Sequence, residues 1–125
     1  MARRSIEITS FAHSNPIPAA SRVGPLLISS IIAPRDPAKE SVPDSADAQL
    51  DNLFHHVGEI LKESGADWKH IVRMTFYVPD GSYRDLINRP WVQRFPDAGS
   101  RPARYTNVNP GGGKIVTCEF TAYIE

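Results

Sequence analysis

Arg104 and Glu119 are the two residues whose types and positions are best suited to chemistry on a ligand. Arg104 follows Arg101-Pro102-Ala103 and enters a short segment that predicts a strand. The planar guanidinium of an arginine can donate two charge-assisted hydrogen bonds to one carboxylate. Arg104 is therefore a candidate carboxylate-binding residue. The alternative is an arginine on the surface, held in an ion pair with solvent around it.

Glu119 lies in an expected final strand, where it shares one face with Thr117 and Thr121. The other face of this strand is apolar and predicts a core: Val116, Cys118, Phe120, Ala122 and Ile124. A carboxylate in a cavity can orient a water molecule and move protons. The same pattern also fits a sheet that exposes one of its faces to solvent. Both interpretations stay open on the sequence alone.

Other polar residues are less informative. Asn88 could hydrogen-bond a ligand or cap the segment that follows it. His55 and Glu59 are four apart, but no third ligand has suitable spacing, so no metal site is predicted. Cys118 is expected to be an inert core thiol. Residues 111–114, Gly-Gly-Gly-Lys, precede a strand and not a helix, so they predict a hairpin turn and not a phosphate loop.

Two helices are expected. The first covers residues 46–64, capped by Asp44 or Ser45 and ended by Gly65. Its apolar residues recur at helical spacing: Leu50, Leu53, Val57, Ile60 and Leu61. The second runs from about 83 to 95, with an interruption or bend at Pro90, which lacks the N–H of a helix interior.

Strands are predicted around these helices by alternating or continuous apolar residues. The ranges are 4–9, 26–32, 70–78, 104–108 and 115–124, with a loop over 33–45 and a turn over 109–113. The order predicts one α+β domain over residues 1–125, with a single sheet and two helices. Two helices cannot cover both faces of such a sheet. Apolar pairs such as Leu27 with Ile31 and Ile71 with Tyr77 then need another partner, and a closed symmetric oligomer would supply it.

Composition narrows the class of protein. The 125 residues are 41% hydrophobic and 22% charged, and 14 basic residues balance 14 acidic ones. A nucleic-acid partner is not expected, because such proteins normally carry a basic excess. The single cysteine fits a reducing compartment. We find no apolar run that could serve as a signal peptide or membrane span, so a cytoplasmic protein without a membrane partner is predicted.

The order and spacing of several short motifs resemble the RidA/YjgF family over about residues 15–124. The C-terminal part carries the strongest likeness: Pro102-Ala103-Arg104, a Pro-Gly turn and Val116-Thr117-Cys118-Glu119-Phe120-Thr121-Ala122. Further matches are Asn88 with Trp91 and Phe95, Ser30 with Pro34 and Asp36-Pro37, and the segments from Gln49 to Leu61, Gly65-Ala66, Ile71-Val72 and Tyr77-Val78.

This resemblance implies a chorismate-mutase-like α+β fold and a homotrimer with clefts between subunits. It also implies hydrolysis of reactive enamines and imines, such as 2-aminoacrylate, to a 2-oxo acid and ammonia without a cofactor. In that picture Arg104 binds the substrate carboxylate and Glu119 places or activates water, while Ser30 and Asn88 line the cleft. Positioning with modest acid–base help would suffice, because imines hydrolyse spontaneously.

Four positions depart from the family pattern. Ile17 replaces a pocket tyrosine, Ile31 and Ile32 replace a glycine and a glutamine, and Thr106 stands where the family often carries cysteine. Ile17, Ile32 and Thr106 are expected to contact the substrate. Because Ile17, Ile31 and Ile32 are apolar and at least one of them should approach the cleft, a bulkier and more apolar imine is expected. The alternative is a trimer that binds a small hydrophobic carboxylic acid without converting it. Cleavage of RNA, reported for some relatives, fits poorly with zero net charge.

Overall fold

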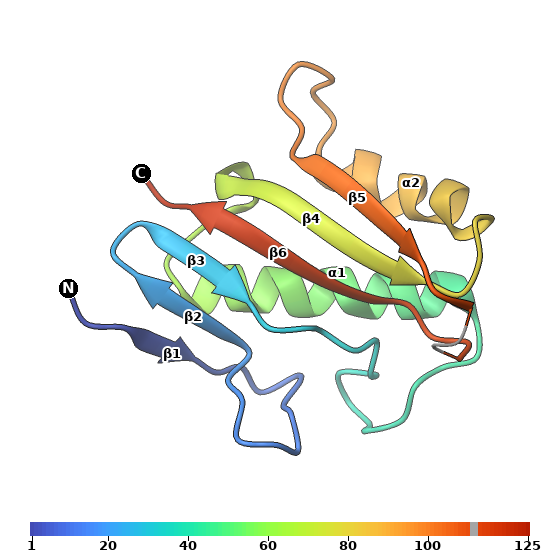
Figure 1. The fold of residues 1–125 in the computed structure, drawn as a ribbon, viewed down its shortest axis with the longest axis horizontal. Helices are drawn as coiled ribbons and strands as arrows, with labels where there is room; N and C mark the ends of the chain where they lie inside the picture. The colour runs from blue at the N-terminus through green and yellow to red at the C-terminus, as the bar shows by residue number, and fades with distance from the viewer. Residues whose placement is uncertain (111–112) are drawn as a thin grey trace.

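The computed structural model describes residues 1–110 and 113–125 as one six-stranded sheet with two helices on one face (Figure 1). The elements are β1 Arg4–Ile6, β2 Ala20–Val23, β3 Leu26–Ser29, α1 Ala46–Glu63, a 3₁₀ turn Trp68–His70, β4 Ile71–Val78, α2 Tyr83–Arg94, β5 Ala103–Val108 and β6 Thr117–Tyr123. The strand order is β1-β2-β3-β6-β4-β5. Among the strands of the described residues only β4 and β5 are parallel, so the sheet is mixed and the predicted α+β class is confirmed.

The helix over 46–63 begins and ends as the sequence predicted. The Ser45 hydroxyl accepts a hydrogen bond from the Ala48 N–H at 3.2 Å. At the other end Gly65 adopts φ 73°, and the Ala66 N–H donates to the Leu61 carbonyl at 2.8 Å. This is the Schellman arrangement, in which a glycine takes the left-handed conformation without steric cost.

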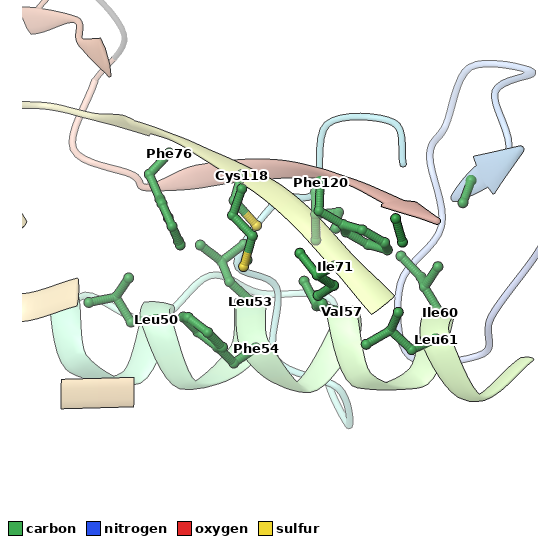
Figure 2. Close-up of a cluster of buried hydrophobic side chains, with 14 of the residues drawn as sticks. Leu50, Leu53, Phe54, Val57, Ile60, Leu61, Ile71, Phe76, Cys118 and Phe120 are labelled. Carbon is green, nitrogen blue, oxygen red and sulfur yellow. The ribbon is translucent and has the colours of Figure 1, made fainter. Parts of the chain in front are cut away.

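The core lies between α1 and the strands β4 and β6 (Figure 2). All five residues of the predicted stripe on α1 are buried. Phe54 extends that stripe, and its ring lies 6.0 Å from the ring of Phe76 on β4. On β6 the predicted alternation is confirmed, because Cys118 and Phe120 point toward the helix while the intervening residues do not.

Pro90 does not interrupt the second helix, so the first of the two predicted outcomes, an interruption or a bend, is absent. The helix is continuous from Tyr83 to Arg94 with Pro90 inside it. A proline there removes one backbone hydrogen bond and costs about 3 kcal/mol in an isolated helix. Burial of Ile87, Pro90 and Trp91 against the sheet offsets this cost, which local propensity cannot register.

One strand was missed. β2 pairs with β3 in antiparallel register, Val23 opposite Leu26, across the two-residue turn Gly24-Pro25. Gly24 has φ 55°, which favours glycine at the first position of such a turn. The strand has a polar Ser-Arg centre, which gave no clear alternation. The predicted turn over 109–113 and the Gly-Gly-Gly-Lys hairpin include residues 111–112, which lie outside the described residues.

The sheet face opposite the helices is uncovered, but of the four residues predicted there Leu27 and Ile71 lie on the other face. Leu27 and Ile71 are buried, whereas Leu26 and Ile28 are 42% and 47% exposed. The predicted strand over 26–32 ends at Ser29, so the alternation does not continue to Ile31. A bulge between Ile71 and Arg73 likewise shifts the alternation of β4 and exposes Val72.

No helix within residues 1–110 and 113–125 is long and apolar enough to cross a membrane.

Candidate functional site

Arg104 lies on β5 at the edge of the sheet, on the side that faces the helices. It pairs in register with the fully buried Met74 of β4. Its guanidinium carbon is 5.1 Å from the ring centroid of Trp91 on α2, a cation–π contact. The side chain is half-buried, and burial lowers the pKa of the guanidinium. Among the described residues no carboxylate or carbonyl accepts a hydrogen bond from Arg104, so its fork is free for an anion.

Two other predicted site residues are placed relative to this arginine by their spacing along β5 and α2. Thr106 is two residues further along β5 and therefore shares the face of Arg104. Asn88 is exposed and precedes Trp91 by three residues on α2, which places both on one side of the helix. Trp91 itself is fixed by an edge-to-face contact with Phe95, whose ring centroid is 4.8 Å away. We call Arg104, Thr106, Asn88 and Trp91 the edge cluster.

Glu119 lies on the uncovered face of the sheet. It lines an open cavity of about 310 Å³ there, which we call the open-face cavity. The other side chains that line it are mostly polar: Arg73, Thr75, Tyr77, Tyr105, Phe120 and Thr121. The Tyr77 hydroxyl donates a hydrogen bond to Glu119 Oε2 at 3.2 Å. A carboxylate with hydroxyl neighbours and open space beside it can hold a water molecule and exchange protons with it.

Arg104 and Glu119 do not meet within one chain, because they occupy opposite faces of the sheet. The central strand β4 fixes this. Met74 pairs with Arg104 on one side and Phe120 on the other, facing the helices. The next residue, Thr75, pairs with Tyr105 and Glu119, facing the open side. A site that contains both Arg104 and Glu119 therefore needs a second chain.

The remaining predicted residues divide between surface and core. Ser30 donates a hydrogen bond to the Pro18 carbonyl at 2.8 Å. Ser30 and Ile31 run alongside Glu119, between the Ile28–Thr121 pair and the Ile32–Cys118 bridge. Ile17 and Ile31 are 45% and 41% exposed. Ile32, in contrast, is fully buried on the helix side of the sheet, so it offers no surface to a ligand in this chain.

His56 and Cys118 are core residues. His56 is fully buried between Ser10, whose hydroxyl is 2.9 Å from Nδ1, and the Arg35 carbonyl, 2.7 Å from Nε2. Burial lowers the pKa of His56 and raises the pKa of the Cys118 thiol, so both are neutral at neutral pH. His55 and Glu59 are 3.7 Å apart on α1. Across the described part of the chain, no three His, Cys, Asp or Glu side chains gather as a metal site would require.

Sequence reasoning did not identify the contacts of Trp91 with Arg104 and of Tyr77 with Glu119. Both depend on pairing between strands and helices distant in sequence. Only the contact of Tyr77 with Glu119 could have been predicted from the sequence. If β4 and β6 are neighbours, their alternation places Tyr77 and Glu119 on one face.

These features define a class: small α+β proteins with helices on one face of a mixed sheet and polar groups at its edge and open face. A sequence model of the family described as Endoribonuclease L-PSP matches residues 8–108. The chain belongs to this family, the RidA/YjgF family, which confirms the resemblance.

Individual relatives agree with this assignment. Over 65 residues the chain is 34% identical to Reactive Intermediate Deaminase A, chloroplastic, of Arabidopsis thaliana; the match covers 52% of this chain and about a third (34%) of that protein's length. The crystal structure of RidA from Psychrobacter sp. PAMC 21119 has a TM-score of 0.86 at 21% identity, covering 97% of this chain and 99% of that one. The YjgF gene product of E. coli gives 0.84 at 22%, covering 96% and 98%. At these identities the two structures establish the fold. Other matched structures are described as a putative endoribonuclease and a putative translation initiation inhibitor.

Proposed function

We propose that this protein hydrolyses a reactive 2-imino acid, or its enamine tautomer, to a 2-oxo acid and ammonia. The observation that carries the proposal is the state of Arg104. A half-buried guanidinium that is stacked on Trp91 and has no acidic partner among the described residues is prepared to bind a carboxylate. The name of the Arabidopsis relative, a reactive intermediate deaminase, supports the same chemistry.

In the proposed reaction Arg104 fixes the substrate carboxylate and Glu119 directs water to the imine carbon. The water oxygen bonds to that carbon as Glu119 takes a proton from it, and the C=N bond becomes C–N. Glu119 returns that proton to the imine nitrogen, which gives a carbinolamine. Glu119 then transfers the carbinolamine hydroxyl proton to nitrogen as the C–N bond breaks, so ammonia is released and the same carbon becomes the carbonyl of a 2-oxo acid. Water is the only co-reactant, and no cofactor is needed. Orientation supplies most of the acceleration for a reaction with a low intrinsic barrier.

We propose that the complete site forms between chains of a homotrimer. The edge cluster of one chain would meet the Glu119 and Ser30 side of its neighbour, which brings together groups that a single chain holds on opposite faces. Support comes from the uncovered sheet face, which exposes Val23, Leu26, Ile28 and Tyr123. An apolar surface of this kind is typical of a subunit interface.

The substrate is proposed to be bulkier than 2-aminoacrylate. Ile17 and Ile31 are exposed and lie near the Ser30 segment, where they could contact an apolar substituent. Thr106 and Asn88 would contact the substrate beside Arg104. Ile32 does not contact the substrate in this proposal, contrary to the prediction, because its side chain packs in the core.

The test is direct. Imines of leucine, phenylalanine and alanine are generated with an amino-acid oxidase, and the release of ammonia is followed with and without this protein. We expect faster release with the protein, and loss of the effect in Glu119→Gln with ligand binding retained. Release at the uncatalysed rate for every imine would refute the proposal.

A second candidate is a non-enzymatic binder of small hydrophobic carboxylic acids. The exposed Ile17 and Ile31, together with the free Arg104, favour it, because binding needs no base. Calorimetry with phenylpyruvate, without turnover of any generated imine, would select this function. RNA cleavage, which the family description names, has less support here because the net charge is zero.

A further inference from the structure

The hydrogen bond between Tyr77 and Glu119 has a further role that depends on its direction. Tyr77 lies on β4 and Glu119 on β6, and the register places Tyr77 opposite Thr117, two pairs along from Thr75 and Glu119 and on the same face. Both side chains line the open-face cavity. The Tyr77 hydroxyl donates to Oε2 only. Within the described chain Oε1 has no hydrogen-bond partner, so it is the oxygen left to accept from water.

A carboxylate that acts on water must present one oxygen in a fixed direction. Glu119 has free rotation about its terminal bond, and an unheld carboxylate would exchange its two oxygens rapidly. The other groups around the cavity are Arg73 and Thr75 from β4, Tyr105 from β5 and Thr121 from β6. Of these neighbours, none forms a hydrogen bond or ion pair with Glu119 in the described structure. Tyr77 alone therefore restrains the carboxylate.

We propose that Tyr77 is a positioning residue, which holds Glu119 Oε2 so that Oε1 takes the proton from the attacking water. The catalytic role of Tyr77 rests on the proposed imine hydrolysis, whereas its interaction with Glu119 does not. In the proposed reaction Tyr77 keeps its proton throughout, and Glu119 gains and returns each of the two protons that pass from the water oxygen to nitrogen. Tyr77 touches no reacting atom and acts through Glu119.

The ionisation of Tyr77 agrees with this role. Burial, the charge of Glu119 and the hydrogen bond to it raise the pKa of the Tyr77 phenol above its ordinary value. The phenol therefore remains a donor throughout the neutral and moderately alkaline range. This property also gives a readout that does not depend on catalysis.

The first measurement is an ultraviolet titration of tyrosinate. The chain has four tyrosines, so the difference between wild type and Tyr77→Phe isolates the ionisation of Tyr77. The same difference is then taken in the Glu119→Gln background. We expect the pKa of Tyr77 to fall when the charge is removed. An unchanged titration would show that the two groups do not interact in solution and would overturn the inference.

The second measurement is the hydrolysis of generated imines. Tyr77→Phe removes one oxygen and keeps the ring, so we expect kcat to fall about tenfold with KM unchanged. The matched control is Tyr83→Phe, which makes the same change on α2, away from the open-face cavity and from the uncovered face of the sheet. A fall in kcat for both variants, or a rise in KM for Tyr77→Phe, would reveal a structural effect and refute positioning.

The two measurements separate this inference from the proposed function. Imine turnover by wild type that is unaffected in Tyr77→Phe refutes the role of Tyr77 and leaves the function intact. Coupled titration without any turnover by wild type refutes the proposed function, and with it the catalytic part of this inference. Coupled titration with a selective fall in kcat is the result we expect.

Discussion

Replacement of Arg104 by alanine tests the proposed site most directly. In a cleft shielded from water, loss of a bidentate contact with a carboxylate costs about 2–5 kcal/mol. This cost corresponds to a fall in kcat/KM of about 30-fold to several thousandfold. Arg104→Lys should recover little, because an ammonium has neither the planar fork nor the same stacking on Trp91.

The fold should survive this substitution. Arg104 is only half-buried, and within the described chain its one specific contact is the Trp91 ring, at 5.1 Å. A cation–π contact contributes about 0.5–2 kcal/mol, against a total stability of about 5–15 kcal/mol for a domain. Circular dichroism and a denaturant midpoint close to that of wild type would verify that any loss of turnover is local.

Arg94→Ala is the matched control. Arg94 also stacks on aromatic rings, with its guanidinium carbon 5.5 Å from Trp68 and 5.8 Å from Phe54, but it lies outside the edge cluster. It should lose a similar stacking energy and keep full turnover. If Arg104→Ala is folded and hydrolyses the generated imines as fast as wild type, Arg104 does not bind the substrate carboxylate and the site is misplaced.

Three further predictions concern assembly, pH and substrate. Light scattering should give three times the 13.8 kDa chain mass, and Ile28→Glu on the uncovered face should lower it; a wild-type monomer would contradict the inter-subunit site. Because burial lowers the pKa of His56 from its ordinary 6.5, the unfolded chain binds more protons below that pH, so stability falls as pH decreases. The denaturant midpoint should therefore drop on acidification from about pH 7.5 to 5.5, and a midpoint that changes equally in His56→Gln would assign the effect elsewhere. Imines of leucine or phenylalanine should react about ten- to a hundredfold faster than that of alanine; Ile17→Ala and Ile31→Ala should reduce this preference, and equal rates in wild type would show that neither isoleucine contacts substrate.

Local sequence patterns predicted most of the fold. The helix over 46–63 was predictable because its cap at Ser45, its stripe and Gly65 act within a few residues of one another. β2 was missed because its register depends on β1 and β3 more than on its own four residues. The assignment of Ile71 and Tyr77 to one face was wrong because a bulge, which local periodicity does not show, intervenes.

The candidate site was predicted as a set of residue types but not as an arrangement. The position of Arg104 at a strand and of Glu119 on the polar face of another followed from alternation. That the two residues lie on opposite faces depends on the pairing of β4 with both neighbours, a long-range property. The burial of Ile32 had the same origin, since its bridge to Cys118 turns it toward the helices.

The double pairing of β4 also constrains how such a protein can change over generations. Arg73, Thr75 and Tyr77 alternate with Met74 and Phe76, so cavity and core share one strand. A single-residue insertion or deletion there would exchange the two sets and carry polar groups into the core. Point substitutions at the cavity positions keep the alternation of the strand, so the core residues stay on their own face. Substrate preference can therefore change in evolution by substitution at alternate positions of β4. Insertions and deletions in β4 would disrupt the core and are not tolerated.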